Sequence, residues 1–115
     1  MKITLATLSF FDHTGFHDSE VSQLDVDYAN HCARIPLKLP LPNDASKKTS
    51  MIFGNVKSLR INIDEKWGPG VYIHDIIVKD GIIKQDNEGQ AFSTTILLNS
   101  GDEIHIVCES IEICD

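Results

Sequence analysis

The chain has 115 residues, of which 42% are hydrophobic and 23% charged, and its formal net charge is −7 at pH 7. This length and balance predict one soluble domain, residues 1–115, with enough apolar side chains for a core of its own. The acidic excess argues against nucleic-acid binding, which needs clustered lysines and arginines, and it favours a basic protein partner instead.

The first residues, MKITLATLSFF, carry one lysine before a short apolar run. Hydroxyl residues interrupt that run, so we expect no signal peptide, and no segment is long enough for a membrane-spanning helix. The three cysteines, Cys32, Cys108 and Cys114, form no CxxC motif and are odd in number. They predict a chain without a disulfide framework in a reducing, cytoplasmic compartment.

Alternating β-branched and polar residues, with turn signals between them, predict strands along the chain. Ile3 to Ser9 is expected to be the first strand, with a short helix as the competing interpretation. From Leu24 to Tyr28 the apolar residues alternate with aspartates, which is the period of a half-buried strand. A turn is expected at 29–31.

The next apolar stripe runs at every second position from Ala33 to Leu41. Pro36 and Pro40 lie on its opposite face and share one parity, so both missing N–H donors fall on the same side of the strand. We therefore expect this strand to be an edge at the two prolines.

The remaining pattern continues in the same way to the end of the chain. We expect a polar loop at 42–50, a broken stripe of Met51 and Phe53 that resumes as Leu59, Ile61 and Ile63, a loop at 65–70, a central strand at 71–78, an Asp80-Gly81 hairpin leading to Ile82-Ile83, a loop at 84–90, and strands at 92–98 and 103–113. The last strand changes phase, which predicts a bulge near Glu109-Ser110. The predicted fold class is all-β: a single-domain antiparallel meander forming a sandwich or a curled open barrel.

The stretch Asp12 to Glu20, DHTGFHDSE, is the densest polar cluster. His13, His17 and Asp18 could bind a metal on a loop, but glycine and threonine between the histidines disfavour a helical zinc motif. Asp and Ser side chains fix turns by accepting backbone hydrogen bonds. We therefore predict a structural latch of His17, Asp18 and Ser19 that holds this loop against the sheet.

Other catalytic patterns are weaker. No phosphate-binding loop is present, and His105 and Cys108 would point to opposite faces of a strand. We predict no catalytic residues, no bound metal and no cofactor. The candidate binding residues are the solvent-facing Asp25, Asp27 and Asp64, which would form one acidic patch if their strands are neighbours, and the loop residue Trp67.

The segment His17-Asp18-Ser19-Glu20-Val21, followed by Asp27 before a turn, resembles small bacterial β-rich proteins such as the immunity protein 50 family of polymorphic toxin systems. The later segment Ser58 to Ile63, SLRINI, extends this resemblance over the first half of the chain. The resemblance implies toxin neutralisation by binding and implies no catalytic residues.

Three hypotheses about function follow. The first is a non-enzymatic, immunity-like protein that binds a basic toxin through an acidic surface. The second is a β-sandwich that binds a carbohydrate or another small ligand with Trp67. The third is a metal-dependent enzyme built on His13, His17 and Asp18. The sequence leaves the oligomeric state open.

Overall fold

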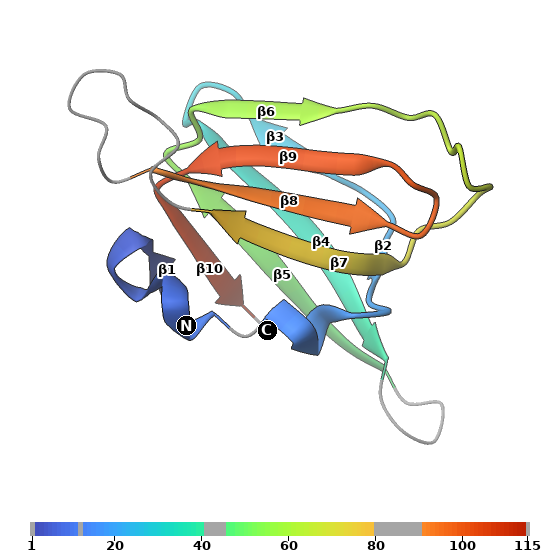
Figure 1. Cartoon of the computed structure of the whole chain (residues 1–115). Helices are drawn as coiled ribbons and strands as arrows, with labels where there is room; N and C mark the ends of the chain where they lie inside the picture. Colours follow the sequence, from blue (N-terminus) through green and yellow to red (C-terminus); the bar gives the residue numbers. More distant parts are fainter. Residues whose placement is uncertain (1, 12, 41–45, 80–90, 115) are drawn as a thin grey trace.

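A computed structural model describes residues 2–11, 13–40, 46–79 and 91–114. These residues form two antiparallel sheets that are not closed into a barrel, which confirms the predicted all-β class (Figure 1). The elements are β1 Lys2–Thr4, the 3-10 helices η1 Leu5–Phe10 and η2 His13–Phe16, β2 Glu20–Val21, β3 Asp25–Asp27, β4 Cys32–Pro40, β5 Ser46–Gly54, β6 Ser58–Ile61, β7 Ile73–Lys79, β8 Phe92–Leu98, β9 Glu103–Cys108 and β10 Ser110–Cys114.

Sheet A has the order β1-β10-β5-β4-β2, and β3 pairs with the beginning of β4 on the same side as β2. Sheet B has the order β6-β9-β8-β7. Figure 1 shows the strands of sheet A running diagonally across those of sheet B, which lie close to horizontal in that view. The two sheets therefore pack with their strands crossing steeply, an arrangement in which corners are made by strands that bend from one sheet into the other.

The chain makes such a corner twice at one place. It passes from β5 to β6 just after Gly54, and from β9 to β10 at Glu109, whose N–H donates to the Gly54 carbonyl at 3.0 Å. Asn55 adopts a left-handed φ of 49° and donates to the Glu109 carboxylate at 3.1 Å. The predicted break near Glu109-Ser110 is therefore the point where the chain changes sheets, and Ile104, Ile106, Cys108 and Ile111 all reach the core on either side of it.

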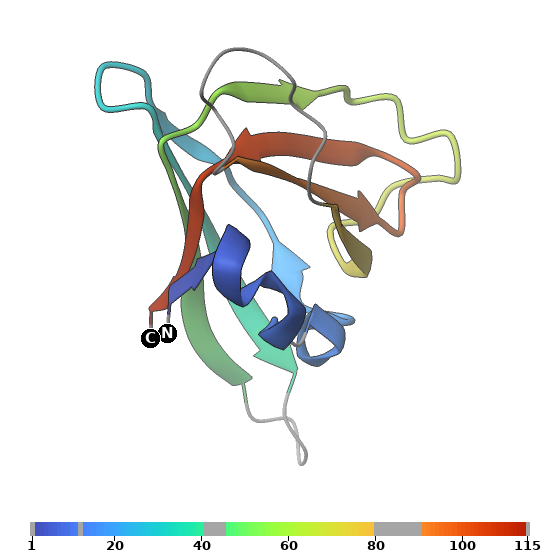
Figure 2. The ribbon, with the colours of Figure 1, turned by 60° about the vertical axis from the view of Figure 1, so that its left-hand side comes forward.

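The core fills the space between the sheets. It is lined by the apolar stripes read from the sequence, with Ile35, Met51, Phe53, Phe92, Ile96 and Ile106 fully buried. Phe11 and Phe16 add two buried rings, 6.0 Å apart, from the N-terminal segment. Figure 2 shows that segment lying between the sheets on the β7 side. Burial of each large side chain stabilises the fold by about 1.5–3 kcal/mol.

The prolines of β4 interrupt pairing on one side only. The ladder with β5 runs continuously from Ala33 to Pro40. On the other side β3 pairs with Cys32–Arg34 and β2 with Leu37–Lys38, so no described residue pairs with Pro36 or Pro40 there. Among the described residues Ile35 and Leu39 also lack a partner on that side, so the two gaps include both positions where the sequence predicts a missing neighbour.

Three expectations about local structure are wrong. The first strand ends at Thr4, and the competing helical interpretation holds from Leu5 to Phe10. The polar segment 42–50 is not a loop throughout, because β5 begins at Ser46. The strand expected at Leu24 to Tyr28 covers only Asp25–Asp27, since the turn already begins at Tyr28. Leu41, Asp80-Gly81, Ile82-Ile83 and the loop at 84–90 lie outside the described residues.

Two further expectations about burial are also wrong. β7 is the last strand of sheet B rather than a central one, and Ile77 is exposed on it. The stripe beyond Leu59 does not return to the core, because Ile61 and Ile63 lie on the outer strand β6 and the loop after it, with Ile63 82% exposed. Both errors come from the same limit: alternation shows which residues share a face, but strand order decides whether that face is covered.

Candidate functional site

The segment after η2 is bonded to the beginning of β7. The Asp18 N–H donates to the Ile73 carbonyl at 2.8 Å, and the Ile73 N–H donates to the Ser19 carbonyl at 2.9 Å. The Val21 N–H donates to the Val71 carbonyl at 2.7 Å. These backbone bonds connect β2 of sheet A to the outer strand of sheet B, so the segment joins the two sheets on the side opposite the corner.

The side chains of the predicted latch contribute unequally to this junction. His17 Nδ1 donates to the His74 carbonyl at 2.9 Å, and its Nε2 lies 3.5 Å from the Asp18 carboxylate. Asp18 is exposed and has a left-handed φ of 66°. Ser19 is fully buried, and its hydroxyl has no hydrogen-bond partner among the described residues. The backbone at Asp18 and Ser19, together with the His17 ring, therefore makes the attachment.

The metal-site alternative concerns the same segment. His17 and Asp18 lie close together, but His17 Nδ1 is already occupied by the His74 carbonyl. The side chain of His13 lies outside the described residues. Within the described ranges, no group of three or more His, Cys, Asp or Glu side chains is placed to hold a metal ion.

An aromatic row lies beside the junction. The rings of His17 and His74 are 6.1 Å apart, and the Trp67 ring meets the His74 ring edge-on at 6.5 Å. Trp67 is 59% exposed. Its backbone N–H donates to the Ser100 carbonyl at 3.0 Å and so positions the residue. The loop before Trp67 is held by Asp102, whose buried carboxylate accepts the N–H groups of Asp64 and Glu65 at 2.9 Å each. These bonds lower the pKa of Asp102 below its usual 3.8.

The predicted acidic patch does not assemble. Asp25 accepts a hydrogen bond from Gln23 and lies 3.5 Å from Arg34. Asp27 accepts hydrogen bonds from the side chain and N–H of Asn30, which lower its pKa. Asp64 lies in the loop that joins β6 to β7, and Figures 1 and 2 both show this loop well away from β3. The candidate residues Asp25 and Asp27 therefore stabilise local structure, and Asp64 and Trp67 belong to a different surface.

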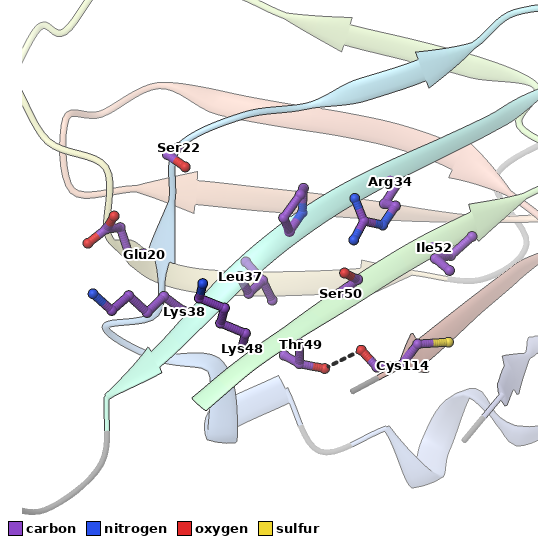
Figure 3. A pocket seen from close by; sticks show the side chains of 11 residues that line it. Glu20, Ser22, Arg34, Leu37, Lys38, Lys48, Thr49, Ser50, Ile52 and Cys114 are labelled. Atoms are coloured by element: carbon purple, nitrogen blue, oxygen red, sulfur yellow. Dashed lines mark hydrogen bonds between the residues drawn. The ribbon is translucent and has the colours of Figure 1, made fainter. Parts of the chain in front are cut away.

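Instead, the outer face of sheet A carries a groove of about 490 Å³ (Figure 3). The register across β2, β4, β5 and β10 sorts its outward residues into rows. One row joins Arg34 to Ile52, the next joins Pro36 to Ser50 and Cys114, and the third joins Glu20 to Lys38 and Lys48. Ser22 completes the wall on the β2 side.

The rows explain why this face is hollow. The middle row consists of small side chains, Pro36, Ser50 and Cys114, and it is flanked by rows that carry long cationic side chains. The floor is fixed from below, because the Thr49 hydroxyl donates to the Cys114 carbonyl at 2.8 Å. Opposite Pro36 no described residue pairs with β4 between β2 and β3, and Ser22 lines the groove on that side. A small floor between long walls therefore produces the concavity.

The charge in the groove is opposite to that of the protein as a whole. Arg34, Lys38 and Lys48 line it together with one carboxylate, Glu20, although the chain has a net charge of −7. None of these cations was among the predicted site residues. The alternation of β4 does place Arg34, Pro36 and Lys38 on the face away from the core, but Lys48, Ser50 and Cys114 join them only through the pairing of distant strands.

The cysteines differ in burial. Burial raises the pKa of the Cys108 thiol to about 12, so at neutral pH it is protonated and a poor nucleophile. Cys32 and Cys114 are free and half-buried, and Cys114 lies in the groove. Cys108 is therefore a core side chain.

No protein-family model matches this chain, and none of the curated proteins matches it either. Within the residues that the structure describes, no helix has both the length and the apolar character needed to cross a bilayer.

Proposed function

We propose that this chain is a binding protein without catalytic activity and that its principal site is the groove on the outer face of sheet A. The single observation that carries this proposal is the built concavity: a floor of small side chains with Arg34, Lys38 and Lys48 around it. Its volume of about 490 Å³ falls within the range of small-molecule sites, about 300–1,000 Å³. The rim supplies charge and the floor supplies small and apolar contacts, which is the usual division in ligand pockets.

The immunity-like role remains a proposal from the sequence resemblance and the net charge. It requires a basic toxin to meet an acidic surface, whereas Asp25 and Asp27 are engaged in local hydrogen bonds. The groove offers a different kind of complementarity, and the geometry supports it better than the three predicted aspartates. A basic partner would have to bind elsewhere on the molecule.

The groove can be tested with a fragment library containing equal numbers of anionic, cationic and neutral compounds. Binding is followed by amide chemical shifts of the isotopically labelled protein. Ser50→Tyr places a ring in the floor of the groove, and Thr95→Tyr places the same ring on β8 of sheet B as a matched control. We expect shifts clustered on β4 and β5 that disappear in Ser50→Tyr and persist in Thr95→Tyr. An absence of shifts there, or their survival in Ser50→Tyr, would contradict the proposal.

A second candidate function is carbohydrate binding at the aromatic row. The observation that favours it is the exposed Trp67 ring beside His74 and His17, because sugars stack on exposed aromatic faces. A glycan array probed with the native protein and with Trp67→Ala tests this function. Glycan binding that survives the loss of Trp67 would exclude the row as the site.

A further inference from the structure

We infer that the groove holds a small organic anion, with its phosphate or carboxylate group seated between the Arg34 guanidinium and the Lys48 ammonium group. This inference rests on the proposed function, since it names the class of ligand for the same site. Charged and neutral probes distinguish a failure of this inference from a failure of the proposed function.

The first observation is a repulsive pair of lysines. Lys38 and Lys48 are direct cross-strand partners and point to the same face of sheet A. Like charges in this position destabilise a sheet. Neither ammonium group has an ion pair or hydrogen bond within the described ranges, and the neighbouring Glu20 carboxylate makes no salt bridge with Lys38. A bound anion would relieve this repulsion.

The second observation is the orientation of Arg34. Figure 3 shows its guanidinium turned toward Ser50 in the floor of the groove, while the Lys48 amine extends from β5 toward β4. Arg34 is half-exposed, and its contact with Asp25 is long, at 3.5 Å. Its planar group is therefore able to present a second edge to a ligand. Guanidinium groups bind phosphate and carboxylate through two parallel hydrogen bonds.

The surroundings define the rest of the ligand. Ser50 lies in the floor between the two cations and supplies a hydroxyl donor. Pro36 and Ile52 give the floor an apolar portion. Glu20 lies beside Lys38, so the third row is less favourable for an anion than the space between Arg34 and Lys48. The ligand is therefore an organic molecule with one strongly anionic end, small enough for about 490 Å³.

The experiment compares sugars that share one ring and differ in the group at carbon 6, which is neutral, a phosphate or a carboxylate. Glucose 6-phosphate, glucuronate and glucose are titrated into the labelled protein, and inorganic phosphate is titrated separately. We expect both anionic sugars to shift the amides of β4 and β5, glucose to leave them unchanged, and added salt to weaken the anionic probes. The phosphate and carboxylate arms show which group the site prefers.

Variants that remove a positive charge then test the proposed position of the anionic group. Arg34→Gln and Lys48→Gln should each weaken the preferred probe about tenfold or more, because each removes a charge-assisted hydrogen bond. Arg60→Gln on β6 and Lys79→Gln on β7 are matched controls on sheet B and should bind as the native protein does. Lys48→Gln should also raise the melting temperature, which separates lost binding from lost folding.

The inference is overturned if the anionic probes bind Arg34→Gln and Lys48→Gln as well as they bind the native protein. It is also overturned if weak shifts scattered over the surface indicate an adventitious ion only. Two other results would overturn the inference and leave the proposed binding function standing. One is that glucose binds as strongly as glucose 6-phosphate, and the other is that the groove binds only neutral fragments. If no probe or fragment binds in the groove, both the inference and the proposed binding function are contradicted.

Discussion

Lys38 on β4 and Lys48 on β5 face each other directly across the β4–β5 ladder, on the same side of the sheet. The repulsion between two like charges lowers the stability of the folded protein, and uncharged residues at these positions would avoid it. It is tolerable on a sheet surface because water and salt screen the repulsion. Its position at the rim of a groove connects the stability of this face with what the groove binds.

Lys48→Gln is expected to stabilise the unliganded protein by about 0.2–1 kcal/mol, because it removes a like-charge cross-strand pair. The measurement is the free energy of unfolding in urea at low salt. Lys79→Gln on β7 is the control and should change stability less. High salt should shrink the gain. A loss of stability in Lys48→Gln at low salt would mean that Lys48 has a stabilising role instead.

Gly54→Ala should destabilise the corner by about 1–3 kcal/mol, because a Cβ there would lie 2.6 Å from the Ser110 hydroxyl oxygen. The same substitution in a Ser110→Ala background should cost much less, since the Ser110 Cβ is 4.0 Å away and in ordinary contact distance. A double-mutant cycle of unfolding free energies measures the coupling. Equal costs in both backgrounds would show that the hydroxyl is not the obstacle.

The predicted latch should depend on backbone conformation at Asp18 more than on its carboxylate. Asp18 has a φ of 66° and an exposed side chain, so Asp18→Gly should be tolerated, whereas Asp18→Val should cost about 1–2 kcal/mol. His17→Ala should cost about 0.5–1.5 kcal/mol through the lost bond to the His74 carbonyl. Thermal unfolding of the three variants tests this ranking. If Asp18→Gly proves as damaging as Asp18→Val, the carboxylate itself is required.

Asp102 should make stability depend on acidity. Its pKa is lowered in the folded state by the N–H groups of Asp64 and Glu65, so the unfolded state binds a proton at higher pH. Its contribution is therefore complete above the usual pKa of 3.8 and is lost as the pH falls through the lower, folded value. Native protein should exceed Asp102→Asn in stability at neutral pH, and the gap should narrow in acid. The exposed Glu103→Gln is the comparison variant. A gap independent of pH would contradict this account.

Alkylation should distinguish the cysteines. With a pKa of about 12, the buried Cys108 thiol should resist iodoacetamide at pH 8 in the native protein, whereas the half-buried Cys32 and Cys114 should react. Mass spectrometry of the digested protein gives the extent at each site. Modification of Cys108 at the rate of the other two would mean that the β9 corner opens readily.

The sequence predicts the strands better than it predicts their neighbours. Alternation identifies the buried faces of β4 and β5, and the change of phase at Glu109 marks the place where β9 becomes β10. These are properties of one strand at a time. The burial of Ile61 and Ile63 is predicted wrongly because it depends on what lies beside β6.

The candidate site shows the same division. Arg34 and Lys38 can be assigned to the outer face of β4 from parity alone, but nothing in the sequence says that Lys48 stands opposite Lys38. The sequence identifies Trp67 as a loop residue, but its neighbours His74 and His17 come from separate segments. Sites assembled across strands require the register, and the register follows from packing of the whole domain.

The pairing of β1 with β10 has a consequence for how the molecule is made. Among the described residues β1 pairs with Ser110–Glu112 alone, so a chain emerging from the ribosome holds β1 unpaired until residues 110–112 have been synthesised. β10 is also the strand that lies between β1 and β5, so sheet A lacks an interior strand until then. Contacts so distant in sequence slow folding, because a long loop must close before they form. Removal of β10 should therefore leave an incomplete sheet with open strand edges, and such chains should aggregate rather than fold to a smaller domain.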